Sequence, residues 1–287
     1  MAEVRKNVVS IRVATTAGVC FGVERALNLS ERALKELTGP ISSVGPIIHN
    51  PQTVENLSSR GLKVAKNIAE AEGTVVFRSH GVSLQTQREA AAKGLKIVDA
   101  TCPLVKVPQN FARKLSAAGY FVVLVGDELH PEIDGVKSYV ENGEIAVIRG
   151  ASDVESLPAK EKVGIICQTT LKKSVFDEVV DACKKKFPEV KVHNTICSAT
   201  KDRQEAAYEL AREVDCMVVI GGRNSSNTQK LFDICKELTP DTYLVETPDE
   251  IKKSWFESVT SVGITAGAST PQKLIEDVHS CIASLTK

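Results

Sequence analysis

Three cysteines in this sequence occur at matching places in a repeated pattern. Cys20, Cys102 and Cys197 each stand between a short β-branched run and a helical run. Each is followed after 24 or 25 residues by a glycine, at Gly45, Gly126 and Gly221. The start of a helix stabilises a thiolate, because its unpaired N–H groups and its dipole favour negative charge. Three thiolates on one repeated template therefore predict a shared metal site.

The spacing of these cysteines narrows the kind of metal. Three soft sulfur ligands suit zinc or an iron–sulfur cluster. A structural zinc site would want a fourth cysteine or histidine in a local pair such as C-x2-C, and the sequence has no such pair. Three well-separated thiolates leave a [4Fe–4S] cube with one iron free to bind a substrate. The alternative, three ordinary small buried residues, does not explain the constant spacing.

The other five of the eight cysteines are expected to be structural. Cys183, Cys235 and Cys281 fall in helical patterns and Cys216 begins a strand. Cys167, two residues before Thr169, could line the site without binding metal. The first ten residues lack the apolar run of a secretory signal. A network of disulfides is therefore disfavoured, because such bonds are rare in reducing compartments.

A second set of residues places neutral hydrogen-bonding groups at the ends of expected strands. They are His49, His80, His130, Thr169, Ser225, Ser226, Asn227 and Ser269. Such donors, together with turn N–H groups, bind phosphate well. The segment GGRNSSNTQK lacks the G-x4-G-K-[ST] pattern of a nucleotide-binding loop, so a diphosphate on a small substrate is favoured over a nucleotide. A plain turn with a helix cap remains the alternative for NSSN.

One carboxylic acid stands close to this set. Glu132 follows His130 by two residues in the segment HPE. A carboxylic acid at the rim of a cluster site could act as a proton donor. The alternative is a surface glutamate before a helix, which would need no function.

The elements that must position these groups alternate along the whole chain. Short β-branched runs alternate with helical stretches, which predicts an α/β fold with mostly parallel sheets. Three similar modules are expected: residues 21–100, 101–196, and 197–287 together with 1–20. In each, a strand ends in a glycine turn with a polar tip, a second strand enters an acidic helix, and a third strand ends on His80, Thr169 or Ser269.

The third module lacks a last strand of its own, and Ile11–Thr15 could supply it and close a ring. Ligands bind at the carboxyl ends of parallel strands. A pseudo-threefold arrangement would therefore bring all the polar tips to one central cavity.

The composition excludes some classes of partner. Lys+Arg and Asp+Glu both number 36, so the charge footprint of a nucleic-acid or membrane binder is missing. No stretch approaches the roughly 18 apolar residues that a membrane span needs. A cytoplasmic location, with no nucleic-acid or membrane partner, is expected.

The motifs together resemble the 4-hydroxy-3-methylbut-2-enyl diphosphate reductase family, iron–sulfur oxidoreductases of the non-mevalonate isoprenoid pathway. The resemblance runs in order from about Ala14 to Pro271, through the segments GVCFGVERA, GPIIHNPQ, RSHGVS, DATCPLV, HPE, QTT, NTICSAT, GGRNSSN and TAGASTP. It implies a three-lobed α/β fold around one [4Fe–4S] cluster per chain with an open iron. It also implies reductive dehydroxylation of (E)-4-hydroxy-3-methylbut-2-enyl diphosphate to isopentenyl and dimethylallyl diphosphate, with electrons from a donor such as ferredoxin or flavodoxin.

The resemblance also implies roles for single residues. Glu132 matches the acid that delivers protons, and Thr169 matches a hydroxyl near the substrate alcohol. The family's cluster ligands correspond here to Cys20, Cys102 and Cys197. The family residues that hold the diphosphate correspond here to His49, His80, His130, Ser225, Ser226, Asn227 and Ser269.

The chain departs from the family pattern at two positions. After DATCPLV the family often continues to a Val-His pair, whereas this chain has Val107, Pro108 and Gln109, which puts any role of that histidine in doubt here. Val19 replaces a common phenylalanine, which implies a packing change beside the cluster. Neither departure touches a matched ligand.

Two other classes of function stay open on the sequence. A non-redox iron–sulfur hydro-lyase would want arginines for a carboxylate substrate, yet Arg78 and Arg223 are near the tips and not at them. An iron–sulfur sensor or electron carrier would not need Glu132 or a diphosphate site, and a carrier usually binds its cluster with four cysteines.

Overall fold

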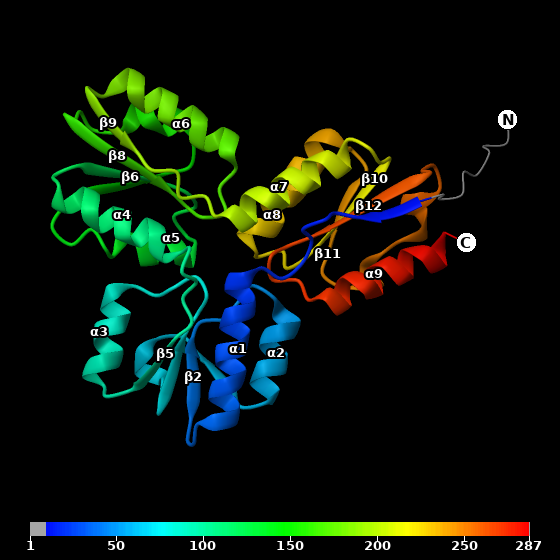
Figure 1. Cartoon of the computed structure of the whole chain (residues 1–287), viewed down its shortest axis with the longest axis horizontal. Coiled ribbons are helices and arrows are strands. Elements are labelled where there is room, and N and C mark those ends of the chain that lie inside the picture. Colours follow the sequence, from blue (N-terminus) through cyan, green and yellow to red (C-terminus); the bar gives the residue numbers. More distant parts are fainter. Residues whose placement is uncertain (1–9, 287) are drawn as a thin grey trace. The chain divides into compact units, whose positions relative to one another are not determined.

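The computed structural model describes residues 10–286 and contains three four-stranded sheets within that range. Every pair of neighbouring strands is parallel. In each sheet the second strand lies at one edge, next to the first, followed by the third and the fourth, if the N-terminal strand Ser10–Val13 is counted as the fourth strand of the third module. Figure 1 shows helices packed beside each sheet. The expected α/β class with three similar modules is confirmed.

The first module shows how local sequence sets each element. Ser83 caps a helix by accepting a hydrogen bond from the Thr86 N–H at 3.2 Å. After the edge strand, Asn67 accepts from the Ala69 N–H and caps a single 3-10 turn, where an acidic helix was expected. The module consists of α1 (Phe21–Glu36), β2 (Ile41–Val44), α2 (Pro51–Ser59), β3 (Leu62–Ala65), η1 (Ile68–Glu70), β4 (Thr74–Phe77), α3 (Leu84–Ala92) and β5 (Lys96–Asp99).

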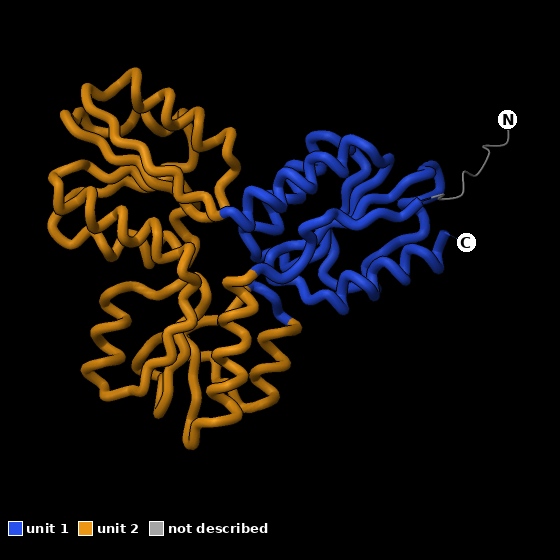
Figure 2. The backbone as a smooth tube through the Cα atoms, viewed as in Figure 1, with its two compact units in different colours: residues 1–20, 49–51, 198–287 blue, residues 21–48, 52–197 orange. Residues whose placement is uncertain are grey.

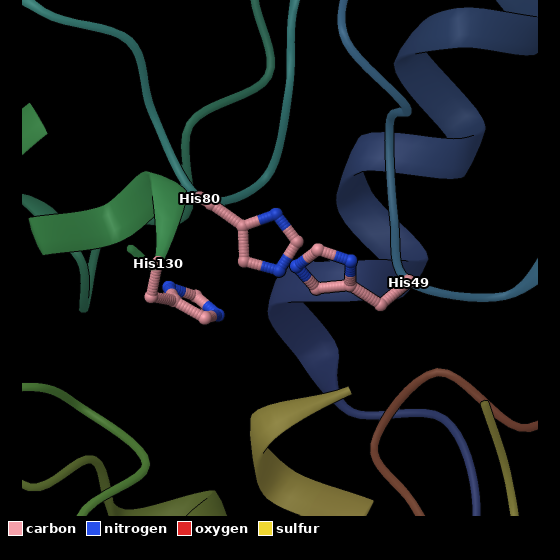
Figure 3. Close-up of side chains that lie close together, drawn as sticks. All are labelled: His49, His80 and His130. Carbon is pink, nitrogen blue, oxygen red and sulfur yellow. The ribbon is translucent and has the colours of Figure 1, made fainter. Parts of the chain in front are cut away.

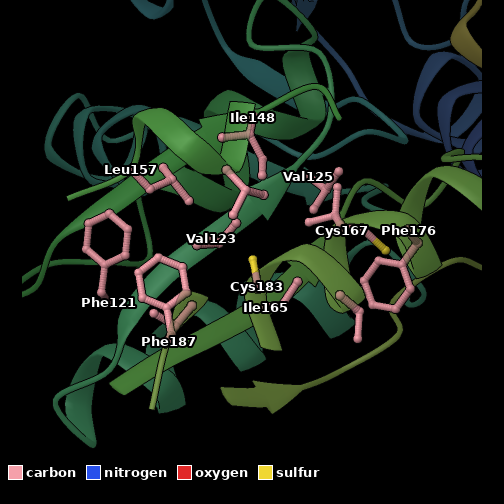
Figure 4. Close-up of a cluster of buried hydrophobic side chains, with 14 of the residues drawn as sticks. Phe121, Val123, Val125, Ile148, Leu157, Ile165, Cys167, Phe176, Cys183 and Phe187 are labelled. Carbon is pink, nitrogen blue, oxygen red and sulfur yellow. The ribbon is translucent and has the colours of Figure 1, made fainter. Parts of the chain in front are cut away.

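The second module buries both faces of its sheet at the two central strands, Phe121–Val125 and Lys162–Cys167, which explains why these strands are almost wholly apolar. Val123 and Val125 pack with Phe176 of the helix on one face (Figure 4), whereas Val122 and Leu124 pack with helices on the other. Alternation along one strand thus supplies two cores. The module consists of α4 (Lys106–Ala117), β6 (Phe121–Val125), α5 (Pro131–Lys137), β7 (Ile145–Ile148), η2 (Ala151–Ser156), β8 (Lys162–Cys167), α6 (Lys173–Lys186) and β9 (Glu189–Val192).

The third module borrows its last strand from the beginning of the chain. Ser10–Val13 pairs in parallel with β12, with Ser10 opposite Ser261 and Val13 opposite Ile264. The prediction that the N-terminal strand completes this sheet is therefore confirmed. The module consists of β1 (Ser10–Val13), α7 (Ser198–Ala211), β10 (Cys216–Ile220), α8 (Ser226–Leu238), β11 (Thr242–Val245), η3 (Pro248–Glu250), η4 (Lys253–Phe256), β12 (Ser261–Ala266) and α9 (Gln272–Leu285).

A side chain near the end of the last helix braces the 3-10 turn in each module. Lys93 donates to the carbonyls of Ile68, Ala69 and Ala71, the last at 2.7 Å. Lys186 makes the equivalent bonds to Val154, Glu155 and Leu157 at 2.7–2.9 Å. In the third module Cys281 takes this place and its Sγ lies 3.7 Å from the Pro248 carbonyl. The repeat therefore extends to single side chains.

By its internal contacts the chain divides into two compact units (Figure 2). Unit 1 holds residues 1–20, 49–51 and 198–287, and unit 2 holds residues 21–48 and 52–197. The module boundaries 21–100, 101–196 and 197–287 with 1–20 remain a prediction, and residues 1–9 and 287 lie outside the described part. Within residues 10–286, no helix combines the length and the apolar character needed to cross a membrane.

Candidate functional site

The three predicted ligand cysteines occupy one equivalent position in the three modules. Each follows the fourth strand of its sheet, and its N–H donates at 3.0 Å to a carbonyl two residues past the third strand. The donors Cys20, Cys102 and Cys197 pair in this way with Ala268, Ser79 and Thr169. All three cysteine residues are partly exposed. The constant spacing thus reflects a repeated backbone geometry.

Two arginines that the sequence analysis did not single out brace the segments before two of these cysteines. Arg203 is buried and donates twice to the Gly18 carbonyl, at 3.2 and 2.6 Å. Arg25 donates to the Thr101 carbonyl at 3.2 Å. Each arginine stands five or six residues after the preceding ligand cysteine, and this spacing was the signal available. A guanidinium fork suits such multiple bonds.

The remaining cysteines are mostly interior residues. Cys167, Cys183, Cys216 and Cys235 are fully buried, and burial raises the pKa of their thiols to about 11 or 12. Cys167 belongs to the core of the second module and bonds to Thr195, so it packs rather than lines open space. These thiols stay protonated near neutral pH and are poor metal ligands.

The predicted polar residues all follow the first or the third strand of a sheet. These two strands are neighbours with connections running to opposite sides, the point where open parallel sheets bind ligands. A glycine opens each turn after the first strand, and its N–H donates to the end of the second strand at 2.8–3.0 Å. Gly45 (φ +71°) and Gly221 (φ +149°) adopt backbone angles that other residues rarely adopt.

In unit 2 the structure brings two predicted histidines together. The rings of His80 and His130 meet edge to face with centroids 5.5 Å apart (Figure 3). His130 caps α5, and its Nδ1 accepts the Glu132 N–H at 3.1 Å. Since Nδ1 is an acceptor, the proton of a neutral His130 ring is assigned to Nε2. His49, also drawn in Figure 3, belongs to unit 1.

Glu132 lies inside the protein, contrary to the expectation of a rim position. It is 1% exposed, and its carboxylate accepts from the Thr169 N–H and from the Thr169 hydroxyl, both at 2.7 Å. Burial raises the pKa of Glu132 to about 7, although the two hydrogen bonds from Thr169 act in the opposite direction. Because His130 caps α5, Glu132 stands in the first turn of that helix, where its side chain reaches Thr169. An acid tuned near neutrality results.

Unit 1 carries the other predicted anion-binding residues. Ser225 caps α8 by accepting the Thr228 N–H at 3.3 Å, and Ser226 begins that helix. The Ser269 hydroxyl donates to the His49 carbonyl at 2.9 Å. Asn227 is 5% exposed, yet neither atom of its side-chain amide has a hydrogen-bond partner among the described residues. A buried amide in this state is costly unless a ligand or water satisfies it.

Two arginines relevant to the hydro-lyase alternative serve the framework. Arg223 forms ion pairs with Glu246 and Glu250 on the surface. Arg78 donates to the Gly81 carbonyl at 3.0 Å, and burial lowers its pKa against the opposing effect of Asp134. The ion pairs occupy the Arg223 guanidinium, and the Gly81 carbonyl occupies the Nε of Arg78.

Gln109, the departure from the family pattern, is buried in unit 2. It is 3% exposed, and its Nε2 has no hydrogen-bond partner among residues 10–286. A side chain at Gly81 would approach this atom to 2.9 Å. The glycine therefore leaves room for the amide beside the His80 turn.

The fold and the site define a class: a parallel α/β protein of three modules, with a partly exposed cysteine after the last strand of each sheet and neutral donors at its strand ends. The LytB protein family model matches residues 11–283, so the chain belongs to that family.

Named relatives agree along nearly the whole chain. Proteins called 4-hydroxy-3-methylbut-2-enyl diphosphate reductase are similar to it in Geobacter metallireducens (48% identical, covering 93% of this chain and 95% of the relative) and in Aquifex aeolicus (46%, covering 96% and 97%). A solved structure described as (E)-4-hydroxy-3-methyl-but-2-enyl diphosphate reductase, the terminal enzyme of the non-mevalonate pathway, is 46% identical with a TM-score of 0.72, covering 96% of this chain and all of that one. A reductase structure from Plasmodium falciparum is 26% identical with a TM-score of 0.91, covering 96% and 87%.

Proposed function

We propose that this chain is an iron–sulfur oxidoreductase that converts (E)-4-hydroxy-3-methylbut-2-enyl diphosphate to isopentenyl and dimethylallyl diphosphate. Each substrate takes up two electrons and two protons, its allylic C–O bond breaks, and the oxygen leaves as water. Membership of the LytB family and relatives of this name at 46–48% identity support the proposal.

Cys20, Cys102 and Cys197 are the proposed ligands of one [4Fe–4S] cluster. The residues fit the group, because three equivalent, partly exposed cysteines are present and the four cysteines with clearly raised pKa values lie elsewhere. Bound there, a cubane held by three thiolates would have one iron without a protein ligand and would supply electrons one at a time.

The diphosphate is proposed to bind to the neutral donors at the strand ends. Asn227 supports this role most directly, because its buried amide offers donors and an acceptor that the described chain does not use. Neutral donors would hold the anion and thereby orient the carbon chain of the substrate. Such orientation lowers the activation barrier of the reaction. The proposed set is His49, His80, His130, Thr169, Ser225, Ser226, Asn227 and Ser269.

One contact network carries the proposal for the chemistry. Thr169 donates two hydrogen bonds to Glu132, and its own carbonyl accepts the N–H of Cys197. Thr169 thus links a carboxylic acid with a pKa of about 7 to a proposed cluster ligand through hydrogen bonds. Glu132 holds a proton below about pH 7 and can pass it through the Thr169 hydroxyl toward the leaving oxygen, with His130 as a second donor.

The electrons are proposed to come from a separate carrier such as ferredoxin or flavodoxin, and the cytoplasm is the proposed location. Neither nucleic acid nor a membrane is proposed as a partner.

An anaerobic assay tests the function. Purified protein with reconstituted iron and sulfide is mixed with the hydroxylated diphosphate and a reduced viologen, and the products are identified by mass spectrometry. Both five-carbon diphosphates are expected. Glu132→Gln should bind substrate but not turn over, whereas Glu128→Gln, at an exposed ion pair with Lys137, should behave as wild type. Iron-loaded protein that makes neither product would refute the proposal.

A further inference from the structure

One side of the second module carries an apolar and cationic surface that the proposed chemistry does not use. Along α4 and the turn before it, Leu104, Val107, Phe111 and Lys114 follow one another at spacings of three, four and three residues, so they share a face. Leu104 is 36% and Val107 37% exposed, so this face presents two large apolar side chains to solvent.

The edge strand continues this face. The ring of His193, directly after β9, stacks on Phe111 with centroids 3.9 Å apart and the planes 22° apart. Lys114 lies over the Phe111 ring at 5.9 Å, and Lys191 lies over Tyr120 at 5.7 Å. We call Leu104, Val107, Phe111, Lys114, Lys191 and His193 the α4–β9 face.

The face is cationic. Neither Lys114 nor Lys191 has an ion-pair partner among the described residues, and both are exposed. Lys162 extends the cationic side, since its Nζ lies 5.9 Å from the Tyr120 ring. The carboxylate in contact with this group is Glu189, which accepts from the Tyr120 hydroxyl and lies 4.0 Å from Lys162. Lysines therefore outnumber carboxylates, which favours an acidic partner.

The position of the face connects it to the redox chemistry. It begins two residues after Cys102, and His193 precedes Cys197 by four residues, all within unit 2. A protein seated on this face lies against the two segments that carry these proposed ligands. Lysines on an edge strand also discourage pairing with a second copy of the chain.

We propose that the α4–β9 face is the docking surface for an acidic one-electron carrier protein. This rests on the proposed function, which needs two electrons brought from outside the chain. Apolar Leu104 and Val107 would form the dry centre of the contact, and the lysines would set its charge complementarity.

The test separates docking from chemistry. Lys114→Glu/Lys191→Glu and Val107→Ser are compared with wild type, and Lys252→Glu, an exposed lysine in unit 1, is the control for charge reversal. Binding of a ferredoxin is measured by calorimetry at two salt concentrations, and turnover is measured with that ferredoxin and with reduced viologen.

We expect the double variant to weaken ferredoxin binding at least tenfold at low salt and to flatten its salt dependence. Val107→Ser should weaken binding severalfold at both salt concentrations. Viologen-driven turnover should stay within twofold for every variant, and the control should match wild type throughout. Unchanged ferredoxin binding in the double variant overturns the proposal, as does a wild-type dimer that Val107→Ser dissociates in sedimentation. Failure of viologen-driven turnover in the wild type would instead refute the proposed reaction.

Discussion

Replacing Glu132 by glutamine should remove a pH-dependent loss of stability that the wild type carries. Burial raises the pKa of Glu132 from 4.5 to about 7. The folded state therefore keeps a proton that the unfolded chain has already lost across this window. The contribution of Glu132 to the free energy of unfolding is therefore largest below pH 4.5 and falls as the pH rises toward 7. A shift of this size corresponds to about 3 kcal/mol in total.

The glutamine is neutral at every pH and can keep both contacts with Thr169, since its oxygen accepts the N–H and its amide donates to the hydroxyl. Relative to wild type, Glu132→Gln should therefore gain about 2 to 3 kcal/mol in free energy of unfolding between pH 5 and pH 8. Groups that titrate in both proteins cancel in this difference.

Urea unfolding of both proteins at the two pH values measures the gain, and Glu128→Gln is the matched surface control. Infrared difference spectra should show a protonated carboxyl at pH 6 that Glu132→Gln lacks and that titrates near pH 7. Turnover should fall above pH 7 in the wild type as the acid loses its proton. A gain that does not change with pH, or a titration near 4.5, would refute the assignment of Glu132 as a buried acid.

Three other substitutions have distinct expected outcomes. Asn227→Ala should raise the free energy of unfolding by about 1 kcal/mol, since a buried unsatisfied amide is removed, yet weaken diphosphate binding at least tenfold by calorimetry; tighter binding would contradict the role. Arg203→Met should leave the Gly18 carbonyl without its hydrogen bonds from Arg203 and lower the free energy of unfolding by about 2 kcal/mol in urea unfolding. It should also speed the loss of iron to a chelator. Iron retention equal to wild type would mean that the Cys20 segment keeps its conformation without Arg203. Lys186→Met removes three hydrogen bonds to the η2 turn and should lower the free energy of unfolding by about 1 to 3 kcal/mol with turnover unchanged, and a loss of turnover at full stability would show that this brace has another role.

The repeat could be predicted from the sequence because it rests on local patterns. Cysteine spacing, glycine turns and β-branched runs are set by backbone geometry within each module, so the equivalence of Cys20, Cys102 and Cys197 and the borrowed strand β1 were both foreseeable. The same patterns placed the polar tips at the ends of the first and third strands.

What the sequence could not reveal depends on packing between distant segments. The burial of Glu132 follows from its contact with Thr169, 37 residues away. The bond from Arg203 to Gly18 spans 185 residues and leaves no periodic trace. The helix α5 has only seven residues, too short for a clear helical period, and where an acidic helix was expected after β3 the structure has only the 3-10 turn η1.

Iron and sulfide analysis of anaerobically prepared protein tests the central claim most directly, namely that three equivalent cysteines hold one cluster. About four iron and four sulfide per chain are expected for one cubane. Single serine replacements of Cys20, Cys102 or Cys197 should each abolish stable loading, whereas Cys183→Ser should keep it. Stoichiometric zinc in a colourless protein, or full iron loading after loss of one of the three cysteines, would contradict the account.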